Sequence, residues 1–173
     1  MLVGGLPGTG KSTLAVTLAD RAGFEVIRSD AVRKEPGQAG RGRPYTPGWD
    51  DRTYAECLRR AERLLFEGRR VLIDATWREQ RRRRAFLGAA ARWGVPGGLL
   101  ICQATPETVR RRLAARRGDV SDADWAVYQE LVKGWEGVEG LSPGHVHTVP
   151  SDGDPGQVAD HAAGALRELG LLG

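Results

Sequence analysis

The chain has 173 residues, of which 40% are hydrophobic and 28% charged, and its formal net charge is +4. This composition is ordinary for one globular domain with a sizeable core, so we expect a single domain over residues 1–173. The apolar runs are too short to span a membrane, and the first residues do not have the layout of a signal peptide. From these features we expect a cytoplasmic protein rather than a membrane or secreted one.

The basic and sulfur-containing residues narrow the functional classes further. Of the 26 basic residues 23 are arginine, and the net charge suits a phosphate ligand but is too small to indicate nucleic-acid binding by itself. Cys57 and Cys102 lie far apart in no metal-ligand spacing, so we expect buried, reduced thiols. The chain contains no asparagine, which excludes the Asn-Lys-x-Asp signature of small GTPases.

The first predicted elements are a strand over residues 1–4 and a helix over Lys11–Ala22. The segment Gly5–Ser12 (GLPGTGKS) connects them and fits the phosphate-binding pattern G-x-x-x-x-G-K-[ST] at every position. The alternative is an ordinary glycine-rich turn between a strand and a helix, but such a turn has no need of the lysine and hydroxyl that complete the pattern. The first strand is short, which predicts either an abbreviated strand or a chain cut from a longer protein.

Each position of this pattern has a physical role. Glycines allow successive backbone N–H groups to point at phosphate oxygens, a lysine adds a mobile positive charge, and the following hydroxyl can ligate Mg²⁺. The N-terminus of the next helix also favours an anion. The residues predicted to bind the nucleotide here are Gly5, Gly8, Thr9, Gly10, Lys11, Ser12 and Thr13.

The rest of the chain alternates apolar runs with helical patterns, which indicates an α/β fold with a parallel sheet covered on both faces. The further strands are expected at Glu25–Arg28, Val71–Ala75, Gly98–Gln103 and His145–Val149. The further helices are expected at Trp49–Glu67 with Gly68 as its cap, at Arg78–Trp93 with Trp93 turned inward, and from Pro106 after the Thr105 cap to about Arg117. Two more are expected after the Ser121–Asp124 capping box and from Gly156 to Leu169.

The least regular stretch is residues 34–48, with four glycines and three prolines. It follows the second strand and so would stand at the carboxyl edge of the sheet, where ligands bind in such folds. We interpret it as an acceptor-binding loop; a disordered surface insertion is the alternative.

Two residues just after the second strand are candidates for chemistry on an acceptor. Asp30 could orient an acceptor hydroxyl or accept its proton, and Arg33 would share its face on a helical turn. The alternative is structural, because Ser29 or Asp30 could cap the short turn over residues 31–34.

A third acidic candidate ends an apolar strand. Asp74 has the position of a Walker B acid, whose carboxylate would hold a Mg²⁺-bound water, although a structural hydrogen bond is the alternative. Thr76 and Trp77 follow on the same edge and could line the acceptor site, with plain packing the alternative for Trp77.

Two arginine clusters and three histidines remain. Arg112 and Arg116 share one face of the helix after the fourth strand, which indicates a lid over phosphates at about residues 105–122. The same cluster contains Arg110, Arg111 and Arg117. The run Arg81–Arg84 spans more than one helical turn, and we interpret it as a solvated helix face. The histidines, at positions 145, 147 and 161, form no nucleophile or metal constellation.

Together the segments GLPGTGKSTLA, VIRSDAVRK, VLIDATW and RLAARRGDVSDADWAVY resemble small P-loop kinases related to polynucleotide kinase and zeta toxin. They are most similar to "predicted kinase" ATP-binding domains, which occur alone or fused behind aminoglycoside-phosphotransferase-like domains. The resemblance implies an adenylate-kinase-like core with strand order 2-3-1-4-5. It also implies that Lys11 and Ser12 hold the triphosphate and Mg²⁺, that Asp30 and Arg33 contact the acceptor, and that Arg112 and Arg116 act in the lid.

The expected activity is therefore an ATP- and Mg²⁺-dependent transfer of the γ-phosphoryl group to a hydroxyl. The expected partners are a nucleoside triphosphate and a small hydroxyl-bearing acceptor, because no stretch interleaves aromatic and basic residues as a nucleic-acid surface would. A polynucleotide 5′-hydroxyl kinase is the alternative enzyme. A nucleotide-binding regulatory module without transfer is the alternative of another class.

Overall fold

The computed structural model describes residues 1–35, 47–116 and 123–172, and at its centre is one parallel sheet of five strands. The strand order is β2-β3-β1-β4-β5, which confirms the order expected from the resemblance. The strands are β1 (Leu2–Gly4), β2 (Phe24–Arg28), β3 (Arg70–Asp74), β4 (Leu99–Gln103) and β5 (Val146–Pro150).

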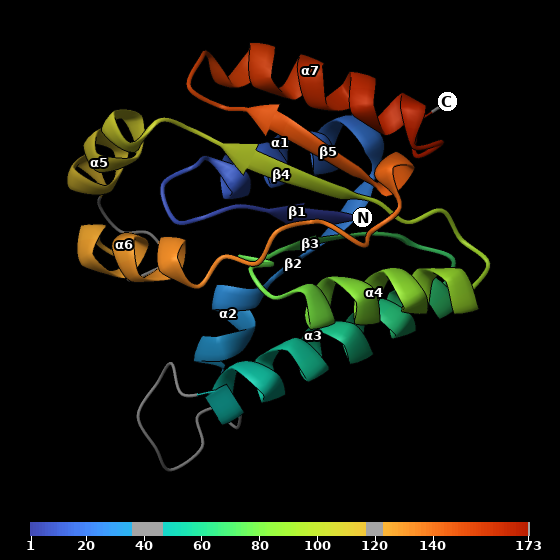
Figure 1. The fold of residues 1–173 in the computed structure, drawn as a ribbon. Helices are drawn as coiled ribbons and strands as arrows, with labels where there is room; N and C mark the ends of the chain where they lie inside the picture. Colours follow the sequence, from blue (N-terminus) through green and yellow to red (C-terminus); the bar gives the residue numbers. More distant parts are fainter. Residues whose placement is uncertain (36–46, 117–122, 173) are drawn as a thin grey trace.

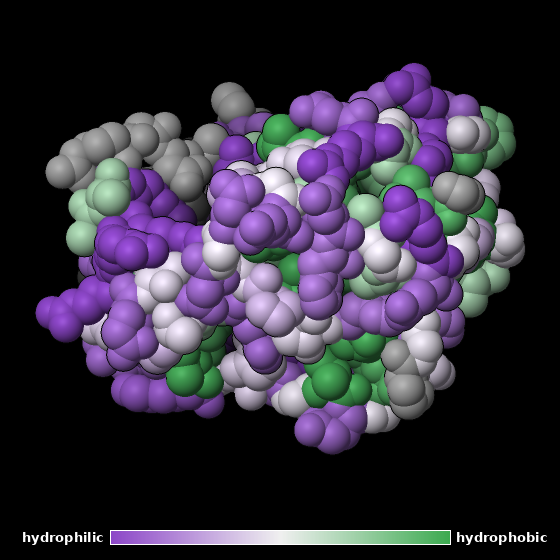
Figure 2. Space-filling view, turned by 90° about the horizontal axis from the view of Figure 1, so that it is seen from above, coloured by the Kyte–Doolittle hydropathy of each residue, from purple (hydrophilic) through white to green (hydrophobic). Residues whose placement is uncertain are grey.

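Helices cover both faces of this sheet, so the α/β three-layer prediction is confirmed (Figure 1). Helices α1 (Lys11–Ala22) and α7 (Pro155–Glu168) cover one face, and α3 (Pro47–Phe66) and α4 (Gln80–Arg92) cover the other. Helices α2 (Ser29–Lys34), α5 (Pro106–Ala115) and α6 (Trp125–Lys133) lie toward the carboxyl ends of the strands. On the outer α7 face, hydrophilic side chains dominate (Figure 2).

The strands are apolar on both sides because each contributes to two cores. In β3, Leu72 packs toward α1 and α7, whereas Val71 and Ile73 pack toward α3 and α4. This alternation follows from the pleat of a strand, and burial of both faces explains the continuous apolar run. The predicted thiols Cys57 and Cys102 are buried and unpaired, and burial raises the pKa of each to about 12.

Helix caps agree with the sequence where a side-chain oxygen can accept a backbone N–H. The Thr105 hydroxyl accepts from Thr108 N at 3.4 Å, and α5 begins at Pro106 as predicted. Asp124 accepts from Val127 N at 2.9 Å and is the cap of α6, whereas Ser121 of the predicted capping box lies outside the described residues. Within the described residues, no helix is both long and apolar enough to cross a membrane.

Some boundary and burial predictions are wrong. The last strand begins at Val146, because His145 closes a 3₁₀ turn over Pro143–His145. Trp93 does not enter the core; it is 39% exposed and its ring contacts Phe66, itself 79% exposed. Helix α4 ends at Arg92, so Trp93 is its C-cap and not part of its core-facing side.

The interpretation of Arg81–Arg84 as a solvated face is also wrong. Arg82 is 7% exposed and Arg83 is fully buried, whereas Arg81 and Arg84 are exposed. The helix turns these two side chains toward the carboxyl edge of the sheet, where carbonyl and carboxylate oxygens receive their N–H groups. A buried arginine is stable only with such partners.

Candidate functional site

The P-loop joins β1 to α1 and has the backbone that its glycines permit. Gly5 has φ 141° and Gly8 has φ 81°, values that other residues rarely adopt. A Cβ added to Gly8 would lie 2.9 Å from Val109 Cγ1 of α5, and one added to Gly5 would lie 2.7 Å from the Cys102 carbonyl oxygen. The loop is therefore closely packed against β4 and α5.

Hydrogen bonds fix the loop from inside and from the neighbouring strand. The Thr9 hydroxyl donates to the Leu6 carbonyl at 2.8 Å, so this side chain stabilises the loop itself. The Ser151 hydroxyl lies 2.6 Å from the Thr9 carbonyl and 2.8 Å from the Gln103 carbonyl, and it can donate its single proton to either. Ser151 was not among the predicted site residues; its only sequence signal is a position directly after the last strand.

A cavity of about 580 Å³ opens beside the loop and contains both predicted lid arginines. Arg112 Nη2 donates to the Ser151 carbonyl at 2.7 Å, while its buried Nη1 has no hydrogen-bond partner among the described residues. That nitrogen would lie 3.5 Å from a Cβ placed on Gly10, so it is directed at the phosphate loop. The lining of this cavity includes Gly8, Gly10, Thr13, Arg112, Arg116, Ser151 and Pro155.

Of the other described residues of the arginine cluster, Arg110 and Arg111 do not line this cavity. Arg110 and Arg111 are exposed, and Arg117 lies outside the described residues. The lid predicted at about residues 105–122 is thus described only as far as Arg116, which lies just after α5. The two arginines do not share a helical face as expected, because Arg116 is the extended residue that caps α5; both nevertheless line the cavity.

Asp74 ends β3, next to the strand that leads into the P-loop. Its register partner in β1 is Val3, and its side chain is 4% exposed. Oδ2 lies 3.5 Å from Arg28 Nε, whereas Oδ1 is buried without a hydrogen-bond partner within the described parts of the chain. A buried carboxylate oxygen of this kind fits a hydrated cation, and Ser12 in the first turn of α1 would supply the hydroxyl for Mg²⁺.

The acceptor-side candidates Asp30 and Arg33 form an ion pair at the end of β2. Arg33 Nη1 lies 3.0 Å from Asp30 Oδ1, and Nη2 lies 2.8 Å from Asp50 Oδ1 on α3. The N-cap of α2 is Arg28, without a side-chain cap hydrogen bond, so neither Ser29 nor Asp30 has the capping role that was the alternative.

These residues line a second cavity, of about 500 Å³, on the other side of the P-loop. Lys11 and Asp30 both line it, so the P-loop lysine and the predicted acceptor-side carboxylate share one cavity. Thr76 lines it as expected, but Trp77 is fully buried against Tyr54 and Phe86 and is a packing residue. The lining residues missed from the sequence include Asp50, Tyr54, Arg78, Arg82 and Ala123, together with Ala126, Val127, Glu130 and Leu131 from α6.

The predicted acceptor-binding loop, residues 34–48, is only partly described. Residues 36–46 lie outside the described residues. At its two ends, Glu35 forms an ion pair with Arg60 of α3, and Trp49 is buried. The binding role of this loop stays a prediction.

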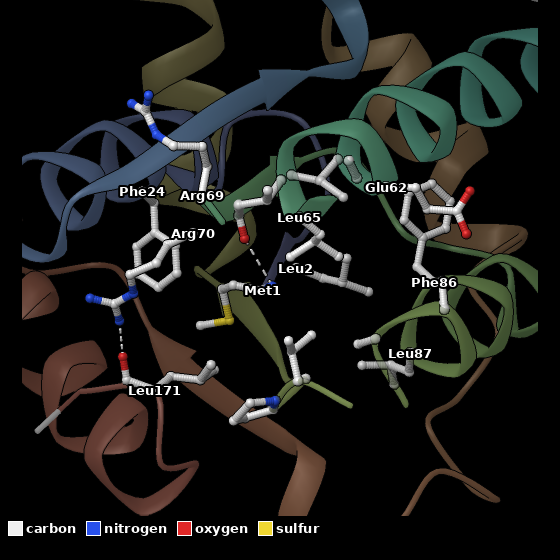
Figure 3. Close-up of a pocket in the computed structure, with 18 of the residues that line it drawn as sticks. Met1, Leu2, Phe24, Glu62, Leu65, Arg69, Arg70, Phe86, Leu87 and Leu171 are labelled. Carbon is white, nitrogen blue, oxygen red and sulfur yellow. Dashed lines mark hydrogen bonds between the residues drawn. The ribbon is translucent and has the colours of Figure 1, made fainter. Parts of the chain in front are cut away.

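A third cavity, of about 450 Å³, lies at the opposite edge of the sheet, where the strands begin. Apolar side chains such as Leu2, Phe24, Leu65 and Phe86 surround it, and Arg70 at its rim donates to the Leu171 carbonyl (Figure 3). No predicted site residue lines this cavity, so the candidate site is confined to the carboxyl edge of the sheet.

The fold and the phosphate loop together define a P-loop nucleoside-triphosphate-binding domain. Residues 1–135 match the family described as AAA domain, and the chain belongs to this family. Uncharacterized proteins of Mycobacterium tuberculosis (Rv2004c) and Mycobacterium bovis (Mb2027c) are 38% identical to it over 132 residues, which are 70% of this chain. The matched residues span only 26% of the length of these relatives.

Two solved structures share the fold over nearly the whole chain. A sugar kinase from Janibacter sp. HTCC2649 superposes with a TM-score of 0.77 at 20% identity, covering 99% of this chain and 96% of the other. A gluconokinase from Sinorhizobium meliloti 1021 superposes with a TM-score of 0.73 at 18% identity, covering 98% and 90%. The fold of this chain is therefore that of small P-loop kinases.

Proposed function

We propose that this protein is a kinase that transfers the γ-phosphoryl group of ATP to a hydroxyl of a small-molecule acceptor, with Mg²⁺ as cofactor. The observation that carries the proposal is the shared cavity onto which Lys11 and Asp30 both face. A P-loop alone binds a triphosphate in motors, switches and kinases alike, whereas an acceptor-side carboxylate beside it serves phosphoryl transfer.

The chain's own residues divide the reaction between them. Asp30, held by Arg33 at 3.0 Å, would hydrogen-bond the acceptor hydroxyl and receive its proton as the oxygen bonds to the γ-phosphorus. The bond from that phosphorus to the β,γ-bridging oxygen breaks, and ADP leaves. Lys11, Arg112 and Arg116 would stabilise the charge on the phosphoryl oxygens.

Magnesium fits the residues present at the phosphate end of the site. Ser12 and Asp74 would hold it, the serine directly and the aspartate through a bound water, as the buried Oδ1 of Asp74 suggests. When bound, Mg²⁺ neutralises charge on the β- and γ-phosphate oxygens.

The size and lining of the cavity favour a small acceptor over a nucleic-acid end. About 500 Å³ is within the usual range for small-ligand sites, and apolar residues of α6 form one wall of the cavity. The sugar kinase and the gluconokinase that share the fold support a hydroxylated small molecule. A polynucleotide 5′-kinase would instead need a basic surface with aromatic side chains for stacking.

The test is a screen with γ-labelled ATP over sugars, sugar acids, other alcohols and DNA or RNA 5′ ends, with Lys11→Ala as the blank. We expect transfer to a small molecule and none to nucleic-acid ends. Transfer to 5′ ends alone would replace this proposal with the polynucleotide kinase. ATP binding without transfer to any acceptor would favour the regulatory module.

Replacement of the proposed base separates catalysis from binding. Asp30→Ala should keep ATP affinity within about threefold and lower the transfer rate by roughly 10²–10⁴, the usual contribution of a general base. Asp20→Ala, an exposed aspartate on α1, is the matched control and should change neither quantity. Unchanged turnover in Asp30→Ala would remove the base assignment, and an equal loss of ATP affinity would assign Asp30 to the metal site.

A further inference from the structure

Arg83 is fully buried, although it stands in a run of four arginines. Its guanidinium donates to four backbone carbonyls. Nε bonds the Trp77 carbonyl at 2.5 Å, and Nη2 bonds the carbonyls of Arg78 at 2.9 Å and Glu136 at 2.7 Å. Nη1 bonds the Gly137 carbonyl at 2.5 Å. The planar guanidinium also lies over the Trp135 ring, 4.9 Å from its centroid.

These carbonyls belong to two segments that are far apart in the sequence. Trp77 and Arg78 lie between β3 and α4, while Glu136 and Gly137 follow α6. Neighbouring bonds join the same segments: Glu136 N donates to the Arg78 carbonyl at 3.0 Å, and the Gln80 side chain donates to the Glu139 carbonyl. In Figure 1 the chain leaving α6 runs toward the start of α4.

Both segments lead directly into the walls of the proposed acceptor cavity. Thr76 and Arg78 line it from the β3 side, and Val127, Glu130 and Leu131 line it from α6. Glu136 is only three residues beyond Lys133, where α6 ends. A fixed distance between the two segments therefore fixes the separation of the two walls.

The backbone of the first segment needs this support. Trp77 has φ 54°, and it is the only residue other than glycine with positive φ in the described chain. Such a conformation is strained and persists where surrounding contacts enforce it. The bond from Arg83 Nε to the Trp77 carbonyl and the bond from Trp77 Nε1 to the Ile73 carbonyl at 3.2 Å act on this residue directly. The turn buries the Trp77 ring while Thr76 and Arg78 line the cavity.

We propose that Arg83 is a positioning residue that holds the β3–α4 segment and the segment after α6 in the register that forms the acceptor cavity. This inference rests on the proposed function, because the cavity is the one assigned to the acceptor. Arg83 itself does not line that cavity, so it acts through Thr76, Arg78 and α6.

The role requires arginine rather than any cation. Four carbonyls in two segments are bridged by a rigid fork of N–H donors, which the single flexible ammonium of lysine does not reproduce. Arg83→Lys should therefore keep the charge and lose the bridge. Arg83→Met keeps much of the volume and loses both.

Hydrogen exchange measured by mass spectrometry tests the bridge without any acceptor. In Arg83→Lys and Arg83→Met, amide exchange over residues 76–79 and 125–139 should rise at least tenfold, while α1 and the central strands keep the wild-type rates. Arg92→Met, an exposed arginine of α4 whose side chain faces Glu62 of α3, is the matched control and should leave the rates in both segments unchanged. A uniform rise in all segments, or no rise in these two, would overturn the proposal; if the methionine variant does not fold, the lysine variant carries the test.

Steady-state kinetics with the acceptor found in the screen gives the functional readout. Arg83→Lys should raise the acceptor KM at least tenfold and change the ATP KM less than twofold, because Arg83 makes no contact with the P-loop cavity. Equal changes in both constants would reduce Arg83 to a stabilising residue. If no acceptor is found, the proposed function fails, while the exchange experiment still decides whether Arg83 joins the two segments.

Discussion

At the scale of single residues, the candidate site contains two buried polar atoms that lack a hydrogen-bond partner among the described residues. These atoms are Asp74 Oδ1 and Arg112 Nη1. A buried polar group without a partner costs about 1–3 kcal/mol, so both residues are maintained at a cost to stability. One atom belongs to a carboxylate and the other to a guanidinium directed at the phosphate loop. In the proposed function, these opposite charges would be in place before a metal–nucleotide complex binds.

The phosphate loop gives the sharpest prediction at this scale. Gly8→Ala should weaken nucleotide binding at least tenfold, because the new Cβ would lie 2.9 Å from Val109 Cγ1 at a φ of 81°. Relief of this contact or of the unfavourable φ would move the loop away from α5 and its arginines. Fluorescent ATP titration measures the affinity. Gly144→Ala, whose Cβ meets nothing within 4 Å, is the control and should bind as the wild type does. Wild-type affinity in Gly8→Ala would show that the loop tolerates a side chain.

At the scale of elements, α7 has a well-capped N-terminus and a glycine of low helix propensity near its centre. Asp154 caps it by accepting from Gly156 N at 2.8 Å and Gln157 N at 3.3 Å, and Pro155 occupies the first helical position. Ala162 and Leu166 bury one face of the helix against the sheet. Gly164 lies between them on a side where an added Cβ meets nothing within 4 Å. Packing therefore offsets the low helix propensity of this glycine.

Gly164→Ala should stabilise the protein by about 0.5–1 kcal/mol, because alanine loses less backbone entropy than glycine in a helix and has room here. Urea unfolding followed by circular dichroism measures the change. Asp154→Ala should have the opposite sign and cost about 1 kcal/mol through loss of the cap. A destabilising Gly164→Ala would mean that α7 packs against a neighbour on that side.

Tertiary packing also explains the acceptor side of the site. Helices α2 and α3 are separated in sequence by residues 36–46, yet Arg33 reaches both Asp30 on α2 and Asp50 on α3. Through Arg33, the Asp30 carboxylate is thus oriented by a helix that begins well after it in the sequence. No spacing rule connects positions 30 and 50, which is why Asp50 was missed while Arg33, three residues from Asp30, was found.

At the scale of the whole molecule, each of the two hydrophobic cores contains one buried cysteine. Cys102 belongs to the core under α1 and α7, and Cys57 to the core under α3 and α4. Burial raises the pKa of both thiols to about 12, so neither forms the reactive thiolate at neutral pH in the folded chain. The two sites sample opposite faces of the same sheet.

A thiol reagent should therefore measure global unfolding. At pH 7.5 we expect no modification of the native protein within hours and modification of both thiols in concentrated urea. Because the folded chain holds these protons up to higher pH than the unfolded chain, the thiols also make stability fall as the pH rises from about 9 toward 12. Mass spectrometry counts the modified sites. Fast labelling of one thiol in native buffer would mean that its core opens independently.

The sequence by itself determined the features that depend on neighbouring residues. The P-loop, the strand expected at Val71–Ala75 and observed at Arg70–Asp74, and the Thr105 cap each lie within a few consecutive positions, where backbone geometry and periodicity act directly. The strand order was implied by family resemblance rather than by any local pattern.

Only the tertiary structure decided which distant groups meet. It placed Lys11 and Asp30 on one cavity, brought Asp50 to Arg33, and buried Arg83 among carbonyls of two separate segments. A run of arginines in the sequence does not reveal whether its N–H donors will bind water or carbonyl oxygens, because those oxygens come from elsewhere in the chain. Burial and partnership are properties of the assembled fold, so local sequence could not supply them.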